Sequence, residues 1–327
     1  MHTSKFLFTA LLGLATMNTA CSNNSSEQSQ ASTSNPQTQA VSTDTASQNT
    51  GSNDDKATPT ETTTANNENS PCPVQVPNDD KDLLSRGNLQ LLEKHGIQVS
   101  QCQVMLNNQS FKIDIYKKEP IGNVRYLALH DSEDAAFDGG LDAIKDGGLM
   151  VVLENNEQRY FYDQARQAVT KKDPNRIFTP SDEFFPLGEF ILQQLHITPD
   201  AYIISLHNNN PDGGFGMKNI KKYGATDILC HQHSDDKNLF WLPYSATTPD
   251  IKELGDKLCA KGIYNVVLEN VPAVADGDGS LSIYAANQGY RYVNIEIRAA
   301  KRNNVDSEQL AKSEQIKHIQ EFLQAVQ

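Results

Sequence analysis

Short apolar segments of strand length alternate with longer segments of helical spacing from about residue 81 onward. Residues 124–129, 202–206 and 292–297 are of the first kind, and residues 184–195 and 250–261 are of the second. Strands that alternate with helices form sheets that the helices cover. The sequence therefore predicts an α/β domain with a mixed, largely parallel twisted sheet flanked by helices.

Other segments fit the same alternation. Residues 81–95 have the spacing of one helix, and residues 307–326 form a closing amphipathic helix. Residues 150–153 and 159–162 flank the turn-forming pair Asn155-Asn156, which predicts a β-hairpin.

The first twenty residues resemble an export signal. Lys5 precedes an apolar run at residues 6–15, which is too short to span a bilayer because a span needs roughly 20 apolar residues. The run ends in Asn18-Thr19-Ala20-Cys21, which resembles a lipobox, although Asn18 departs from the usual aliphatic residue. Residues 1–20 are thus predicted to be a lipoprotein signal peptide and Cys21 the lipidated residue. The alternative is an ordinary secretory peptide.

Residues 21–71 contain almost no large apolar side chain and consist mainly of Ser, Thr, Asn, Gln and Ala. Such a segment cannot bury enough surface to offset the entropy of ordering it, so we expect a disordered linker. Ser22 gives no aspartate-type retention signal, which favours the outer membrane, facing the periplasm, as the location of the lipid anchor. Residues 72–327 then form one domain.

Four cysteines lie in that domain, namely Cys72, Cys102, Cys230 and Cys259. An even number of cysteines in an exported protein permits two disulfides, with three alternative pairings. Cys72–Cys102 and Cys230–Cys259 are favoured because each closes a short local loop. Free buried cysteines are the alternative.

The formal net charge of the chain is −13, and it contains no basic block. This argues against a nucleic-acid partner and against nonspecific binding to an anionic surface. Contact with a membrane is expected through the N-terminal lipid only.

Three apolar strands end in, or contain, an ionisable residue that a core strand would not need: His130, His207 and Glu296. Ligands of open α/β sheets bind outside the carboxyl ends of the strands, so the two strand-end histidines can converge. Glu133 follows His130 by three residues. Two histidines, one carboxylate and an open fourth position are the composition of a catalytic zinc site.

Together with the segment from Asp173 to Arg176, these residues resemble the zinc metallocarboxypeptidase superfamily, which includes carboxypeptidase A, over about residues 123–298. The short separation of Glu133 from His207 is similar to the compact bacterial branch. The resemblance implies that His130, Glu133 and His207 bind Zn²⁺.

The same resemblance assigns further roles. Asp173 would orient a ligand histidine, and Asn175 and Arg176 would bind the free carboxylate of the substrate. Glu296 would transfer the proton between the attacking water and the leaving amine. Arg159 is the candidate for stabilising the oxyanion.

Several assignments have alternatives. Arg166 is the second candidate for the oxyanion arginine. Taken alone, each site residue also fits a purely structural role, such as that of a strand-end histidine hydrogen-bonded to a loop carbonyl. His233 and its neighbour His231 look like a metal pair but fit a polar loop near a disulfide, and Glu154 fits a polar strand end.

Three functions follow for an exported protein with such a site. The first is a zinc carboxypeptidase that removes a C-terminal residue from peptidoglycan-derived stem peptides. The second is a zinc N-acetylmuramoyl-L-alanine amidase, in which Glu269 would be the catalytic glutamate. The third is a non-catalytic wall-binding lipoprotein on the same fold.

Overall fold

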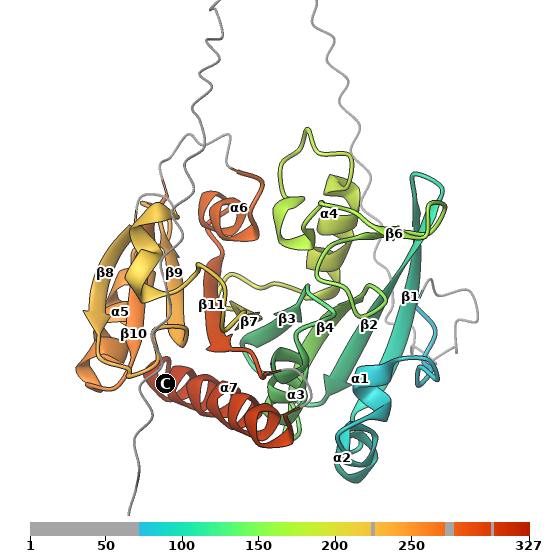
Figure 1. Cartoon of the computed structure of the whole chain (residues 1–327), viewed down its shortest axis with the longest axis horizontal. Coiled ribbons are helices and arrows are strands. Elements are labelled where there is room, and N and C mark those ends of the chain that lie inside the picture. Colours follow the sequence, from blue (N-terminus) through green and yellow to red (C-terminus); the bar gives the residue numbers. More distant parts are fainter. Residues whose placement is uncertain (1–71, 224–225, 272–277, 302–303) are drawn as a thin grey trace, which may run out of the picture. The chain divides into compact units, whose positions relative to one another are not determined.

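The computed structural model describes residues 72–223, 226–271, 278–301 and 304–327. The predicted signal peptide, Cys21 and the predicted linker lie outside these ranges. A nine-stranded sheet crosses the described domain in the order β1-β2-β4-β3-β7-β11-β9-β10-β8 (Figure 1). Its strands are β1 (Gln98–Leu106), β2 (Gln109–Lys118), β3 (Val124–Ala128), β4 (Gly148–Glu154), β7 (Tyr202–Asn209), β8 (Thr226–His231), β9 (Leu239–Tyr244), β10 (Asn265–Asn270) and β11 (Arg291–Arg298).

Helices and shorter elements fill the connections between these strands. The helices are α1 (Lys81–Leu84), α2 (Asn88–His95), α3 (Asp134–Ala143), α4 (Phe185–Gln194), α5 (Asp250–Ala260), α6 (Leu281–Asn287) and α7 (Val305–Ala325). Two 3₁₀ turns, η1 (Pro174–Arg176) and η2 (Met217–Lys222), and a two-stranded ribbon of β5 (Tyr162–Asp163) and β6 (Ala168–Val169) complete the described elements.

The centre of the sheet is parallel. β3 pairs in parallel with β4 and β7, and β7 pairs in parallel with β11. Antiparallel pairs lie on both sides, β1–β2 and β2–β4 on one and β11–β9 on the other, and β8 closes the far edge antiparallel to β10. The predicted α/β fold with a mixed sheet flanked by helices is therefore confirmed, with its parallel pairs concentrated where the strand-end residues lie.

Hydrophobic cores cover the two faces of the sheet, because successive side chains of a strand point to opposite faces. Tyr126 and Ile204 belong to the core that also contains α3, α5 and α7. Their chain neighbours Leu127 and Ile203 belong to the core that contains α4 and α6. Helices thus cover both faces, as Figure 1 shows for α7 and α3 on one side and α4 and α6 on the other.

Both predicted disulfides are confirmed. Cys72 is bonded to Cys102 and Cys230 to Cys259. The first ties the start of the described chain to β1, and the second ties β8 to α5.

Two local predictions were wrong. β4 does not form a hairpin with residues 159–162, because its two edges are already occupied by β2 and β3, and Tyr162 pairs instead with Val169. The predicted helix at residues 81–95 is two helices, because Arg86 and Gly87 adopt φ of 49° and 78° in the left-handed region, which ends a helical path.

Helix α3 packs unusually close to the sheet through a glycine. A Cβ atom built on Gly140 would lie 2.5 Å from Sδ of Met150 on β4 and 2.9 Å from Cδ1 of Leu206 on β7. The missing side chain lets α3 lie near the strands, and Glu133, the residue just before α3, is held beside β7 as a result.

We expect Gly140→Val to destabilise the domain by about 1–3 kcal/mol, since the added methyl groups overpack a filled space. Thermal denaturation should show a midpoint lowered by about 2–4 °C for each kcal/mol. Gly122→Val is the matched control, because nothing lies within 4 Å of the Cβ position of Gly122. Equal midpoints for the two variants would show that the close approach of α3 does not matter.

Candidate metal centre

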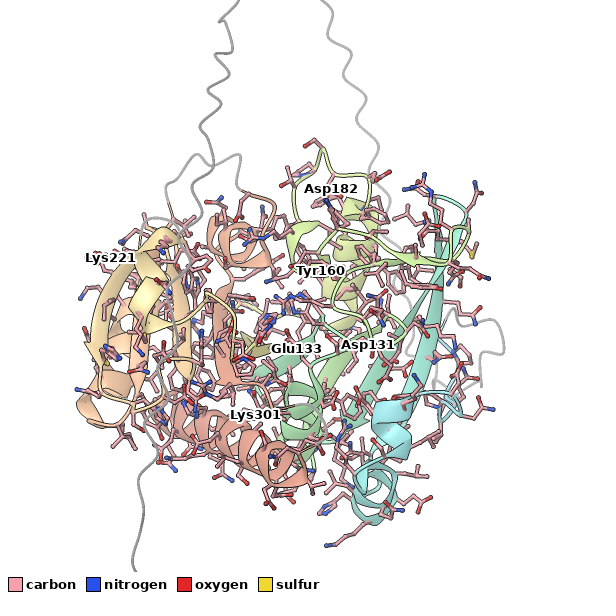
Figure 2. The ribbon with its side chains drawn as sticks, in the orientation of Figure 1. Asp131, Glu133, Tyr160, Asp182, Lys221 and Lys301 are labelled. Carbon is pink, nitrogen blue, oxygen red and sulfur yellow. A yellow bond between two sulfur atoms is a disulfide. The ribbon has the colours of Figure 1, made fainter. Side chains whose placement is uncertain are left out.

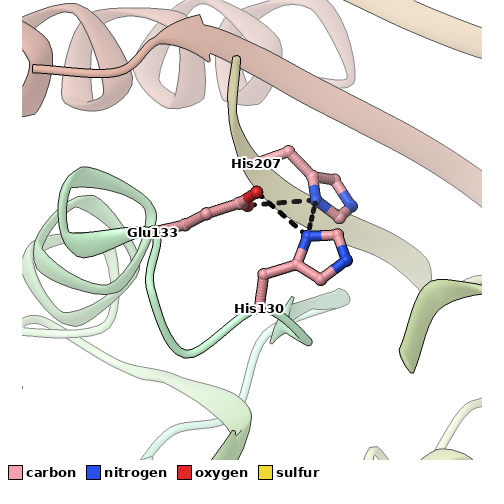
Figure 3. A group of neighbouring side chains, drawn as sticks. All are labelled: His130, Glu133 and His207. Atoms are coloured by element: carbon pink, nitrogen blue, oxygen red, sulfur yellow. Dashed lines mark hydrogen bonds and ion pairs between the residues drawn. The ribbon is translucent and has the colours of Figure 1, made fainter. Parts of the chain in front are cut away.

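Three side chains converge where β3 and β7 end, as Figure 3 shows. His130 follows β3, Glu133 is the residue before α3, and His207 lies in β7. Nδ1 of His130 lies 3.0 Å from Oε1 of Glu133, and Nδ1 of His207 lies 3.2 Å from Oε2 of Glu133 and 3.2 Å from Nδ1 of His130. All three residues are buried. The three side chains that the strand-end argument predicted to converge therefore lie together in the structure.

The sheet explains this convergence. β3 and β7 are parallel neighbours, so their carboxyl ends meet at one edge, and β11 brings Glu296 directly opposite His207 in the next parallel pair. The tight turn after β3 returns the chain so that Glu133 faces both histidines, and its backbone N–H donates to the carbonyl of His130.

The outer nitrogen of each histidine is held by another side chain. Nε2 of His130 lies 2.8 Å from Oδ1 of Asp173, and Nε2 of His207 lies 2.8 Å from Oγ of Ser205. An ionised carboxylate only accepts hydrogen bonds, so Nε2 of His130 carries the proton and donates the hydrogen bond to Asp173. In the neutral ring, the lone pair of Nδ1 then points into the group, which is the form that binds a metal.

Asn208 fixes Glu133 relative to β7. Its backbone N–H donates to Oε2 of Glu133 at 3.0 Å, and its side-chain oxygen accepts from the backbone N–H of Ala136 in the first turn of α3 at 3.1 Å. Sequence reasoning missed both Asn208 and Ser205. Ser205 stands two residues before His207 on the same face of the strand, so the period of two could have indicated it.

The charges of the group are strongly coupled. Burial opposes protonation of His130, but Glu133 and Asp173 outweigh it and raise the pKa of His130 to about 9. Burial opposes ionisation of Glu133 and Asp173, but the histidines outweigh it, so the pKa of Glu133 falls well below its usual value and that of Asp173 falls to about 2. Both carboxylates are therefore anionic and favour a cation in the group.

The donor set fits a divalent metal ion. Two imidazole nitrogens and a carboxylate oxygen lie within 4.8 Å of one another, are buried, and are oriented by Asp173 and Ser205. This is the ligand composition of catalytic zinc sites. Whether the ion is zinc stays a prediction.

Glu296 and Arg159 border the group. The buried Glu296 is 8% exposed, and burial together with the nearby Glu133 raises its pKa against the opposing effect of His207 and Arg159. The guanidinium of Arg159 donates to Glu133, and its second Nη lies 3.9 Å from Oδ2 of Asp173. Arg159, the first candidate for the oxyanion arginine, therefore lies beside the metal centre.

Other predicted residues lie farther out. Arg166 pairs with Asp163 and has a side chain that is 84% exposed, so it is not part of the group. Arg176 pairs instead with Asp278 near the surface. The backbone N–H of Asn175 donates to Asp173, while its side-chain oxygen is buried without a hydrogen-bond partner among the described residues.

No protein-family model and no curated protein matches the chain. Solved structures that resemble it include a candidate metallopeptidase from Shewanella denitrificans, with 14% identity over 78% of this chain and 96% of that chain and a TM-score of 0.38. A succinylglutamate desuccinylase from Silicibacter has 13% identity over 78% and 70% of the two chains and a TM-score of 0.39. An aspartoacylase family protein from Mesorhizobium loti has 11% identity over 70% and 67% and a TM-score of 0.39. These similarities are remote, and the fold and site rest on the topology and contacts above.

We expect zinc to bind more weakly as the pH falls from 8 to 6. The pKa of His130 is raised in the metal-free protein, so below about 9 the ring carries a proton that the metal must displace. The displacement of one proton weakens binding about tenfold per pH unit, or roughly 100-fold over this range. Competition with a chelator of known proton affinity measures the effect. Equal affinity at both pH values would contradict the assignment of His130 as a ligand.

Proposed function

We propose that this chain is a zinc-dependent carboxypeptidase that removes the C-terminal residue from a peptide. The observation that carries the proposal is the buried group of His130, Glu133 and His207 with Glu296 and Arg159 beside it. Metal ligands, a separate carboxylate of raised pKa and a guanidinium can together activate water, transfer a proton and stabilise an oxyanion, which suits hydrolysis of an amide bond.

His130, Glu133 and His207 would hold the zinc ion. When bound, zinc lowers the pKa of a coordinated water and polarises the scissile carbonyl. Asp173 keeps the proton of the neutral His130 ring on Nε2, so that Nδ1 faces the metal position, and Ser205 holds the outer nitrogen of His207. The protein thus presents the ligand atoms in fixed positions before substrate arrives.

Glu296 is the residue suited to move protons. Its carboxylate accepts no hydrogen bond from a described residue, and burial raises its pKa above the usual value. It can therefore accept a proton from water and pass it to the leaving amine. Its strand, β11, adjoins β7, which places Glu296 opposite His207 without making it part of the ligand set.

Two arginines suit the charges of the substrate. Arg159, next to Glu133, can stabilise negative charge that develops on the carbonyl oxygen. Arg176 already binds a carboxylate, that of Asp278, and its side chain is 48% exposed. A free C-terminal carboxylate has the same chemistry as Asp278 and can take its place on the guanidinium.

We extend the proposal to peptidoglycan-derived stem peptides as substrates and to a lipid-anchored location in the cell envelope, at the outer membrane facing the periplasm. The lipobox-like sequence at Cys21 and the predicted linker motivate this location. Two disulfides support export, because they persist in oxidising compartments. No helix within the described ranges has the length and apolar character that crossing a membrane requires.

The amidase alternative needs Glu269 at the metal centre, and the geometry favours Glu296 over it. Glu269 lies on β10, which β9 separates from β11. Its carboxylate accepts a hydrogen bond from Nε1 of Trp241 at 2.7 Å. Burial raises the pKa of Glu269, and its main charged neighbours are Asp278 and Arg176 rather than the histidines.

We expect the zinc-loaded protein to release the last residue from a muropeptide stem with a free C-terminus and not from the same peptide with an amidated C-terminus. Arg176→Ala should lower kcat/KM on the free peptide by roughly 10- to 100-fold, which corresponds to the loss of a hydrogen-bonded charged contact. Arg176→Lys should not restore it, since an ammonium cannot reproduce the planar fork. Product masses give the released residue.

Two controls define the result. Glu296→Gln should abolish turnover with its zinc content unchanged, whereas Arg166→Ala should leave the rate unchanged because Arg166 lies outside the group. Equal cleavage of free and amidated peptides would overturn the carboxypeptidase proposal. Release of intact stem peptides from sacculi would favour the amidase, and zinc binding without any cleavage would favour a wall-binding protein.

A further inference from the structure

A second group of metal-ligating side chains lies on the β1-β2-β4 side of the sheet. One carboxylate oxygen from each of Asp80, Asp114 and Glu154 lies within 4.8 Å of the others. Asp80 precedes α1, Asp114 lies in β2, and Glu154 ends β4. The sheet and the segment before α1 thus bring together three anionic groups from distant parts of the sequence.

Asp114 is the most constrained of the three. It is 0% exposed, and its Oδ1 accepts a hydrogen bond from Nε2 of Gln101, which faces it across β1 and β2. Its Oδ2 is buried and has no hydrogen-bond partner among the described residues. A buried, unpartnered carboxylate oxygen is costly unless a cation or a proton satisfies it.

The other two carboxylates also have free acceptor capacity. Asp80 accepts from the backbone N–H of Leu83 at 2.8 Å through Oδ1 and from the hydroxyl of Tyr116 at 2.9 Å through Oδ2. Each carboxylate oxygen has two lone pairs, so one on each oxygen remains. No described residue donates a hydrogen bond to the side chain of Glu154.

The surroundings do not neutralise the group. Asp80 and Glu154 line a cavity of about 340 Å³ whose wall carries five carboxylates and two lysines. Lys112 pairs with the exposed Asp79, and Lys81 lies 3.9 Å from Glu157. Each lysine is thus engaged with an acidic residue outside the group of three.

Burial is the main cause of the raised pKa values in this group, and the neighbouring carboxylates add to it. Burial, together with Asp80 and against the hydrogen bond from Gln101, raises the pKa of Asp114 to about 7. Burial and the neighbouring aspartates raise the pKa of Glu154 well above its usual value. A bound cation would remove this repulsion.

We propose that Asp80, Asp114 and Glu154 form a calcium-binding site. Carboxylate oxygens are ligands for hard divalent cations. The three side chains leave most of a coordination shell to water, for which the cavity has room. Ca²⁺ tolerates six to eight oxygens in irregular geometry, whereas Mg²⁺ requires a near-ideal octahedron and loses water reluctantly, so Ca²⁺ is the better match.

This site differs in chemistry from the metal centre. Its donors are oxygens only, whereas the first group has two imidazole nitrogens, which favour zinc and similar transition metals. Asp131 follows His130 in the sequence and lines the acidic cavity, and Figure 2 labels both Asp131 and Glu133. Because their donor atoms differ, the two sites can be loaded with different metals and assayed separately.

Thermal denaturation of the full chain with and without CaCl₂ tests the proposal. At about 10 mM, roughly tenfold above the weakest dissociation constants of extracellular calcium modules, Ca²⁺ should raise the midpoint by roughly 3 °C or more. MgCl₂ at the same concentration should raise it less, and NaCl of equal ionic strength should not reproduce the effect. Terbium should also show luminescence sensitised by Tyr116, whose hydroxyl contacts Asp80.

Three variants locate the ion. Asp114→Asn and Glu154→Gln should each abolish the calcium-dependent shift and the terbium signal. Glu314→Gln should retain both, since it alters another acidic and histidine-containing group, that of His233, Glu314 and His318. Either no calcium response in the wild type, or a response unchanged in both Asp114→Asn and Glu154→Gln, would overturn the proposal. If Asp114→Asn does not fold, Glu154→Gln decides.

Discussion

The parallel pairing of β3, β7 and β11 is the constraint on which the candidate site depends. It places His130, two residues past the end of β3, beside the carboxyl-terminal half of β7, and it sets Glu296 directly opposite His207. A shift of one residue in the β7–β11 register would turn Glu296 to the other face of the sheet. The positions of His130, Glu133, His207 and Glu296 follow from this register and from the close packing of α3.

The packing of α3 against the sheet also sets the position of Glu133. The glycine at position 140 lets α3 approach β4 and β7, and Asn208 bonds both to the first turn of α3 and to Glu133. The third predicted ligand is thus fixed by the helix and the strand together. Asp173 and Ser205 then hold the histidine rings from the outside, so the ligand atoms are oriented by contacts that involve no metal.

The sequence was informative where the signal was local. An apolar run that ends in a histidine identifies a strand end from a few residues, which is why His130 and His207 could be predicted. The three-residue spacing from His130 to Glu133 similarly indicates a single tight turn after that strand. Which strands pair with each other, however, is not determined by local sequence. The turn-forming pair Asn155-Asn156 between residues 150–153 and 159–162 predicted a hairpin, but nothing in that segment reveals that both edges of β4 are already paired. The strands β1, β8 and β9 were not predicted.

The acidic group also could not be predicted from local sequence. Asp80, Asp114 and Glu154 come from three separate elements, and no spacing in the chain relates them. Glu154 alone was expected to be a polar strand end, which its position in β4 fits. The sheet order sets Glu154 on β4 beside Asp114 on β2, and the hydrogen bond from Tyr116 holds Asp80 near them. Nitrogen-rich and oxygen-only donor sets on one domain then predict two metals of different hardness.

The most direct test of the metal centre is the position of zinc in crystals of the zinc-loaded protein, from anomalous scattering measured on both sides of the zinc absorption edge. We expect one strong peak about 2.0–2.2 Å from Nδ1 of His130, from the carboxylate of Glu133 and from Nδ1 of His207. A peak only at His233, Glu314 and His318, the other described group with two histidines, or no peak at all, would contradict the account.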